Sequence, residues 1–116
     1  MSKGKMMAQA AHAALGSIVI PTLGDVLGVN DLMDKQQRAR ILSKWILDGM
    51  AKVCVRADGK ELERVIERGR EEGLLVHPVI DAGFTAFDNV PTLTCASIGP
   101  DELGKVDKVT GHLRLL

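Results

Sequence analysis

A helix with one apolar face, set between two short strands, constrains the fold of this chain more than any other feature. Asp58 is a good N-cap, and the apolar residues after it recur on one helical face until Gly73, where a helix is expected to end. The runs 52–57 and 75–80 on either side contain the β-branched and apolar residues that favour strands. A helix between two strands is typical of α/β folds, in which the helix covers one face of a sheet.

The rest of the chain continues this alternation. An Ala-rich segment ends at Gly16, Asp31 is suited to cap a second helix, and Pro100 is suited to begin a short final helix. Glycine and proline break up any period between residues 17 and 30, which predicts a loop there. We predict helices at 6–15, 32–48, 59–72 and 100–109, and strands at 52–57, 75–80 and 92–98. The predicted fold class is α/β, a single-domain layered sandwich over residues 1–116 in which helices flank a small mixed β-sheet.

The balance of charge and the lengths of the apolar runs restrict the partners of the protein. Its 15 basic and 15 acidic residues cancel, so any contact with RNA must come from a local patch rather than from a global field. The longest apolar run, 17–21, is far shorter than the roughly 20 residues that cross a bilayer, and no signal sequence is visible. We therefore expect a cytoplasmic protein without a membrane partner.

The cysteines and histidines are dispersed along the chain. Cys54 and Cys95 lie in apolar, strand-like runs without Cys-x-x-Cys spacing, so we interpret them as small buried hydrophobic residues rather than as disulfide or metal ligands. The histidines lack acidic partners at ligand spacing, which argues against a zinc site. We expect no bound metal.

Asp81 is the strongest single candidate for chemistry. Its carboxylate closes an apolar strand, where a solubilising charge is not needed, and it should lie at a strand end that faces a cleft. The alternative is an aspartate that begins a turn by bonding its own backbone two residues on. The residues alone favour neither interpretation.

Basic and polar residues gather at the start of the first predicted helix. Lys3 and Lys5 flank Gly4, and a helix N-terminus with free amide groups and added lysine charge favours an anion. An ordinary basic turn has the same residues. Gln9 and His12 are three residues apart and can share a helix face, although a lone helical histidine is more often a packed or capping group than a catalyst.

Four stretches of the chain follow one another in an order that resembles the archaeal and eukaryotic type of peptidyl-tRNA hydrolase (type 2). They are KGKMMAQAAHA from residue 3, GMAKVCV from residue 49, VIDAGFT from residue 79 with TLTCASIGP from residue 92, and VDKVTGHLRLL from residue 106. The resemblance implies an enzyme that hydrolyses the ester bond between peptide and tRNA in peptidyl-tRNA, uses no cofactor and forms a homodimer. The alternatives are a non-catalytic member of the same fold that binds a tRNA end or a protein, and a purely structural dimer subunit.

The resemblance also implies roles for individual residues. The catalytic positions of the family correspond to Lys5, Asp81, Thr85 and Thr94. The substrate-binding positions correspond to Lys3, Gln9 and His12. Lys5 and Asp81 would organise the attack of water on the ester, and the threonine hydroxyls would hold the substrate.

The chain departs from the family pattern at two places. Phe84 and Ala86 stand where the family has arginine and glutamine, and the arginine is a planar five-donor group suited to phosphate. Either another cation holds the tRNA, or this chain binds a different substrate, or it has lost activity. The family also begins with a Val-rich strand, whereas only Met1 and Ser2 precede Lys3 here, so we expect a sheet that lacks this strand.

Overall fold

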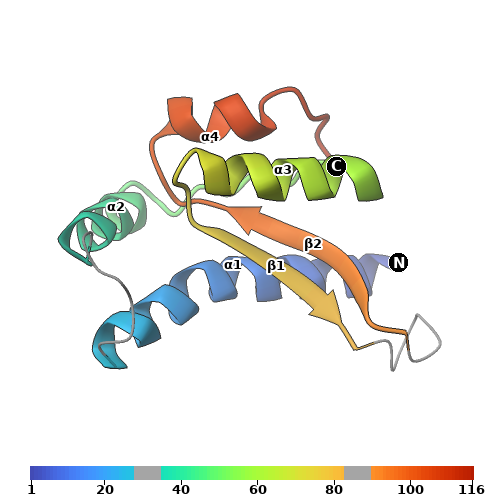
Figure 1. Cartoon of the computed structure of the whole chain (residues 1–116), viewed down its shortest axis with the longest axis horizontal. Helices are drawn as coiled ribbons and strands as arrows, with labels where there is room; N and C mark the ends of the chain where they lie inside the picture. The colour runs from blue at the N-terminus through green and yellow to red at the C-terminus, as the bar shows by residue number, and fades with distance from the viewer. Residues whose placement is uncertain (28–34, 83–89) are drawn as a thin grey trace.

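Two antiparallel strands form the sheet of the computed structural model, and helices lie on both of its faces (Figure 1). The structure describes residues 1–27, 35–82 and 90–116. In chain order the elements are α1 (Lys3–Leu27), α2 (Lys35–Leu47), α3 (Gly59–Glu71), β1 (Val76–Asp81), β2 (Thr92–Ile98) and α4 (Leu103–Thr110). α1 packs on one face of the sheet, and α3 packs on the other with α4 beside it (Figure 1). The predicted α/β layered sandwich is confirmed.

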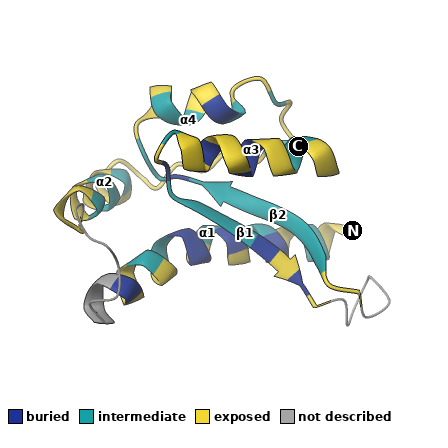
Figure 2. Ribbon diagram, viewed as in Figure 1, coloured by how far each residue is buried: buried dark blue, intermediate teal, exposed yellow. Residues whose placement is uncertain are grey.

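A hydrophobic core cluster lies between α3 and α4, at the end of β2 (Figure 2). Val65 of α3, Leu74 before β1 and Val109 of α4 are buried together, and Val109 has no exposed surface. The partly buried residues that pack against them are Ile98, Val106 and Leu113. Because each fully buried aliphatic side chain contributes about 1.5–3 kcal/mol, this cluster holds α4 against α3 and α3 against the sheet.

α3 forms where its local sequence predicts a helix. The backbone N–H of Glu61 donates to Oδ1 of Asp58 at 2.8 Å, and the backbone N–H of Asp58 donates to Oε1 of Glu61 at 3.4 Å, which completes a capping box. Gly69 lets the helix approach β1 closely, since a Cβ at this position would lie 2.8 Å from Cγ2 of Val76. Capping, amphipathicity and packing therefore specify the same element.

α1 is longer than predicted. The sequence predicts a helix that ends at Gly16 and a loop after it, but α1 continues through Gly16 and Pro21 to Leu27. The reason lies in the sheet, because the ring of His77 on β1 occupies the space that a Cβ at Gly16 would fill. Packing on the sheet outweighs the roughly 1 kcal/mol that glycine costs inside a helix. The predicted loop is therefore wrong over the described part of this segment.

The run 52–57 is not a strand, contrary to the prediction. Val55 makes an isolated antiparallel bridge with Leu115, and Cys54 is exposed rather than buried. Strand propensity is a weak preference that depends on a partner strand, and here the partner is a short segment at the end of the chain. The sheet of the described residues is consequently two-stranded and antiparallel rather than mixed.

The remaining elements agree with the prediction apart from their ends. β2 has the predicted bounds, and β1 is displaced by one residue. α4 begins later than residue 100 because Glu102, not Pro100, is its N-cap. α2 begins at Lys35 and lies to one side of the layers without a buried residue, and the preceding residues 28–34 are outside the described part of the chain (Figure 1).

The segment Lys3–Gly24 of α1 is long and apolar enough to cross a membrane by length and composition alone. The short apolar runs in the sequence predict no such segment, so this expectation is not met. The criterion does not separate membrane helices from core helices, and α1 packs along both strands of the sheet. The length and composition of α1 therefore do not show whether this helix lies in a membrane or in the core of a globular domain.

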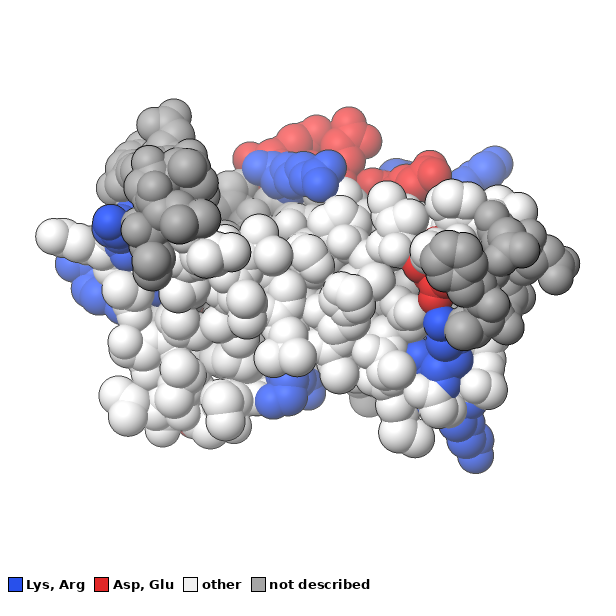
Figure 3. All heavy atoms as spheres, turned by 90° about the horizontal axis from the view of Figure 1, so that it is seen from below, with Lys and Arg blue, Asp and Glu red and all other residues white. Residues whose placement is uncertain are grey.

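The exposed surface of α1 carries an apolar ridge. Met7, Leu15, Val19 and Leu23 are each half exposed or more, and they are spaced by four or eight residues. Residues four apart line up along one side of a helix. Figure 3 views this side of the molecule, and uncharged residues cover most of the middle while lysine and arginine lie mainly toward the edges.

Candidate active site

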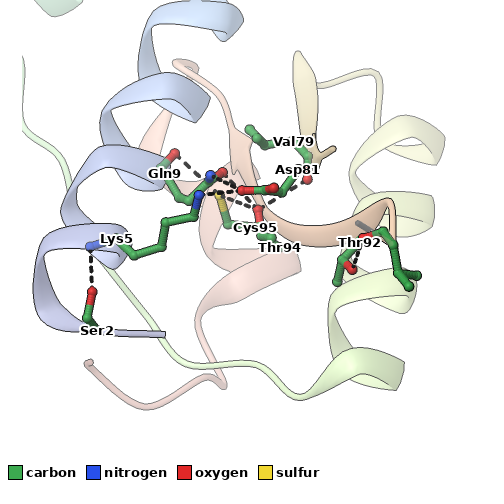
Figure 4. A network of polar contacts seen from close by, with 9 residues as sticks. Ser2, Lys5, Gln9, Val79, Asp81, Thr92, Thr94 and Cys95 are labelled. Atoms are coloured by element: carbon green, nitrogen blue, oxygen red, sulfur yellow. Dashed lines mark hydrogen bonds and ion pairs between the residues drawn. The ribbon is translucent and has the colours of Figure 1, made fainter. Parts of the chain in front are cut away.

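The first turn of α1 and the end of β1 bring Lys5 and Asp81 together (Figure 4). Nζ of Lys5 lies 2.5 Å from Oδ2 of Asp81, and the two side chains are 21% and 8% exposed. Ser2 caps α1, because its Oγ accepts a hydrogen bond from the backbone N–H of Lys5 at 3.1 Å. A buried carboxylate is therefore balanced by a lysine that still reaches solvent.

Gln9 lies one turn after Lys5 on α1 and extends this contact into a chain of polar side chains. Its Nε2 donates to Oδ2 of Asp81 at 3.0 Å, and its Oε1 accepts a hydrogen bond from Oγ1 of Thr94 at 2.9 Å. Gln9 and Asp81 are both buried. Side chains from α1, β1 and β2 thus form one continuous network (Figure 4).

A β-bulge sets the direction of the Thr94 side chain. Val79 of β1 pairs with Cys95, and the register then shifts so that Thr94 is the extra residue of β2. In a regular strand, the neighbours Thr94 and Cys95 would point to opposite faces of the sheet. The bulge allows both to bond Gln9 on α1, Thr94 through its hydroxyl and Cys95 through its thiol.

Cys95 is half-buried beside this network rather than part of a fully buried core. Burial raises the pKa of the Cys95 thiol above its usual value, and the hydrogen bond with Thr94 opposes this shift. The thiol is consequently protonated at neutral pH, and it donates to the backbone oxygen of Gln9 at 3.4 Å. Among the described residues of the network, Asp81 carries the negative charge.

The other predicted site residues lie apart from this network or outside the described residues. Lys3 is exposed at the first residue of α1. The ring of His12 stacks on His77, with 6.2 Å between the centroids, farther along α1. His77 is not among the predicted site residues, although it alternates with Asp81 on β1 and so faces α1 as well. Thr85 lies outside the described residues, as do the neighbouring departures from the family pattern.

The whole chain matches one protein family. The family model described as peptidyl-tRNA hydrolase PTH2 matches residues 1–116. The chain belongs to the PTH2 family. The PTH2 chain is 37% identical over 117 residues to a peptidyl-tRNA hydrolase of Methanocaldococcus jannaschii, with 100% of this chain and 90% of the relative covered.

Other archaeal relatives carry the same description. A peptidyl-tRNA hydrolase of Methanothermobacter thermautotrophicus is 37% identical, with 100% of this PTH2 chain and 89% of the relative covered. One of Pyrobaculum aerophilum is 38% identical, with 99% of the chain and 87% of the relative covered. Likeness over nearly the full length of both chains supports comparison of whole domains rather than of one motif.

The described part of this PTH2 site offers a lysine, a carboxylate, an amide and a hydroxyl. These groups are suited to bind an anion, to orient water and to transfer a proton. Within residues 1–27, 35–82 and 90–116, His, Cys, Asp and Glu do not form a group of three or more that could hold a metal ion.

Proposed function

We propose that this PTH2 chain hydrolyses the ester bond between peptide and tRNA in peptidyl-tRNA and releases free tRNA. The observation that supports this most directly is the contact between Lys5 and Asp81, which are 76 positions apart in the sequence. In the fold, Nζ of Lys5 lies 2.5 Å from Oδ2 of Asp81. Both residues correspond to catalytic positions that the family resemblance implies. The match of the family over residues 1–116 supports the same reaction.

In the proposed reaction, water attacks the carbonyl carbon of the ester and the bond from that carbon to the ribose oxygen breaks. The Asp81 carboxylate accepts a proton from the attacking water and then donates it to the ribose oxygen as that oxygen leaves, which restores the carboxylate. Lys5, at the positive end of α1, faces the negative charge that develops on the attacked carbonyl oxygen. A positioned acid–base group contributes about 10²–10⁴-fold to such a reaction.

The remaining predicted residues keep supporting roles in this proposal. Lys3 adds charge beside Lys5, where the free amide groups of a helix N-terminus favour a phosphate of the tRNA. Thr85, Thr94 and His12 help to hold the substrate. The reaction needs no cofactor and takes place in the cytoplasm.

The alternative, a non-catalytic member that binds a tRNA end or a protein, is not favoured. The contact between two implied catalytic residues supports catalysis, and the relatives are described as hydrolases. Purified protein incubated with an N-blocked aminoacyl-tRNA should release the blocked amino acid with multiple turnovers. Binding of uncharged tRNA is measured alongside. Affinity for tRNA without any release of the amino acid would support the non-catalytic alternative and contradict our proposal.

We also propose that the protein forms a homodimer through the apolar ridge of α1, defined by Met7, Leu15, Val19 and Leu23. The exposed apolar side chains and the scarcity of charge in the middle of this face support a second copy as the partner (Figure 3). Sedimentation should give about twice the monomer mass of 12.5 kDa. Leu15→Glu should yield monomers, whereas Leu47→Glu, on an exposed residue of α2, should not. A monomeric parent protein at micromolar concentration would contradict this assignment.

A further inference from the structure

We propose that Gln9 is a positioning residue of the reaction, which holds the Asp81 carboxylate in place and turns the Thr94 hydroxyl so that its oxygen acts as a hydrogen-bond acceptor. This inference rests on the proposed hydrolysis of peptidyl-tRNA. It gives Gln9 a role through other side chains rather than through contact with the substrate. It also makes a specific statement about which substrate atoms Thr94 is able to meet.

The geometry of the amide fixes its orientation. Gln9 is only 8% exposed, and both ends of its side-chain amide contact protein groups, at 3.0 Å to Asp81 and 2.9 Å to Thr94. An ionised carboxylate only accepts hydrogen bonds, so the NH₂ end of the amide must face Asp81. The oxygen end then faces Thr94 and is able only to accept. The charge on Asp81 therefore sets the direction of the whole chain of hydrogen bonds.

This direction decides what Thr94 offers to a substrate. A threonine hydroxyl has one proton, and here its acceptors are Oε1 of Gln9 at 2.9 Å, the backbone oxygen of Val79 at 3.3 Å and, more weakly, Sγ of Cys95 at 3.8 Å. All three acceptors belong to the protein, so Thr94 presents lone pairs to any other group. Its partner must be a donor, such as the attacking water or a ribose hydroxyl. Thr94 is therefore not the group that stabilises negative charge on the ester carbonyl, which falls to Lys5.

The titratable groups that face Gln9 come from three elements. Lys5 on α1 and Asp81 on β1 form the ion pair, and Cys95 on β2 is a protonated thiol because burial raises its pKa. Farther along α1, His12 stacks on His77 rather than on this network. A new carboxylate at position 9 would thus lie directly beside that of Asp81, and like charges at this distance raise the pKa of one of the two.

Gln9→Glu turns this geometry into a test with a distinctive pH profile. A protonated Glu at this position has one O–H donor for Asp81 and one carbonyl acceptor for Thr94, so it reproduces the pattern of the amide. An ionised Glu has no donor and repels Asp81. The ratio of kcat in the variant to kcat in the parent should therefore be highest near pH 5 and fall roughly tenfold or more by about pH 8. Gln37→Glu, on an exposed residue of α2, is the matched control and should give a ratio near one throughout.

A double-mutant cycle provides the second measurement. Gln9→Met keeps the length of the side chain but removes both hydrogen bonds, and it should lower kcat by about 10–100-fold with little change in KM. Thr94→Val should cost less in the Gln9→Met background than in the parent, because Gln9→Met already removes the hydrogen bond that orients the Thr94 hydroxyl. A flat pH ratio for Gln9→Glu, a rise in KM with unchanged kcat for Gln9→Met, or additive effects in the cycle would each overturn the positioning role. A parent protein without hydrolysis would instead refute the proposed function itself.

Discussion

Replacing Asp81 by Asn tests the proposed reaction most directly, because it removes the charge while keeping the shape of the side chain. The amide oxygen of Asn is still able to accept hydrogen bonds from Lys5 and Gln9, which lie 2.5 Å and 3.0 Å from Oδ2. What is lost is the acid–base group and the charge assistance in these two contacts. Loss of a positioned acid–base group lowers kcat by about 10²–10⁴-fold, so we expect a fall of at least about 10²-fold.

The stability cost of the same change follows from its surroundings. Hydrogen bonds to charged groups contribute about 1.5–3 kcal/mol and neutral ones about 0.5–1.5 kcal/mol, so two contacts lose about 1–3 kcal/mol together. Lys5 is 21% exposed and retains some hydration, which favours the lower end of this range. For a domain of this size, a loss of 1–2 kcal/mol lowers Tm by roughly 5–10 °C. The assay should therefore run well below the Tm of the variant.

The measurement combines kcat on an N-blocked aminoacyl-tRNA, affinity for uncharged tRNA and a thermal melt. Asp101→Asn is the matched control, since Asp101 pairs with Lys105 at 4.0 Å next to α4 and has no part in the network. The control should hydrolyse substrate at the parent rate, and both variants should bind tRNA nearly as the parent does. Hydrolysis by the Asp81→Asn variant at the parent rate would refute the catalytic assignment of this carboxylate.

Three further changes probe the same region. Lys5→Ala should lower kcat/KM and make the salt dependence of tRNA binding flatter by roughly one phosphate contact, whereas an unchanged slope would show that Lys5 does not touch phosphate. Gly16→Ala should destabilise the fold by about 1–3 kcal/mol because its Cβ would overlap a histidine ring of β1, whereas Gly104→Ala, with open space around it, should not lower the Tm. Cys95, whose thiol has a pKa raised by burial, should react with iodoacetamide more slowly than exposed Cys54, and equal rates by mass spectrometry would contradict the assigned burial.

Local signals in the sequence predict the elements whose causes are local. α3 has its capping box and its apolar face within one short segment, so the bounds of the helix follow from Asp58 to Gly73. The strands β1 and β2 likewise lie within a residue of their predicted bounds. The position of Asp81 at a strand end was also predictable from the apolar run before it.

The sequence-based predictions are wrong where contacts with a distant part of the chain determine the secondary structure. Gly16 is a plausible helix stop by its own propensity, but a ring from β1 fills the space beside it, and the helix continues. The run 52–57 is a plausible strand by composition, but within the described part of the chain only the bridge from Val55 to Leu115 pairs it. In both cases the deciding contact joins residues about 60 positions apart, beyond the reach of any local window.

The polar network of the site also depends on a contact between distant segments, the pairing of β1 with β2. Alternation along β2 assigns Thr94 and Cys95 to opposite faces, so a regular strand would direct one of them away from α1. The shift in register between β1 and β2 brings both to Gln9. A bulge depends on how two strands pair, so a single strand sequence does not reveal it. The resemblance to the family names Gln9, Asp81 and Thr94 as candidates, but only the pairing of β1 with β2 explains how the hydroxyl of Thr94 becomes connected through Gln9 to the charge of Asp81.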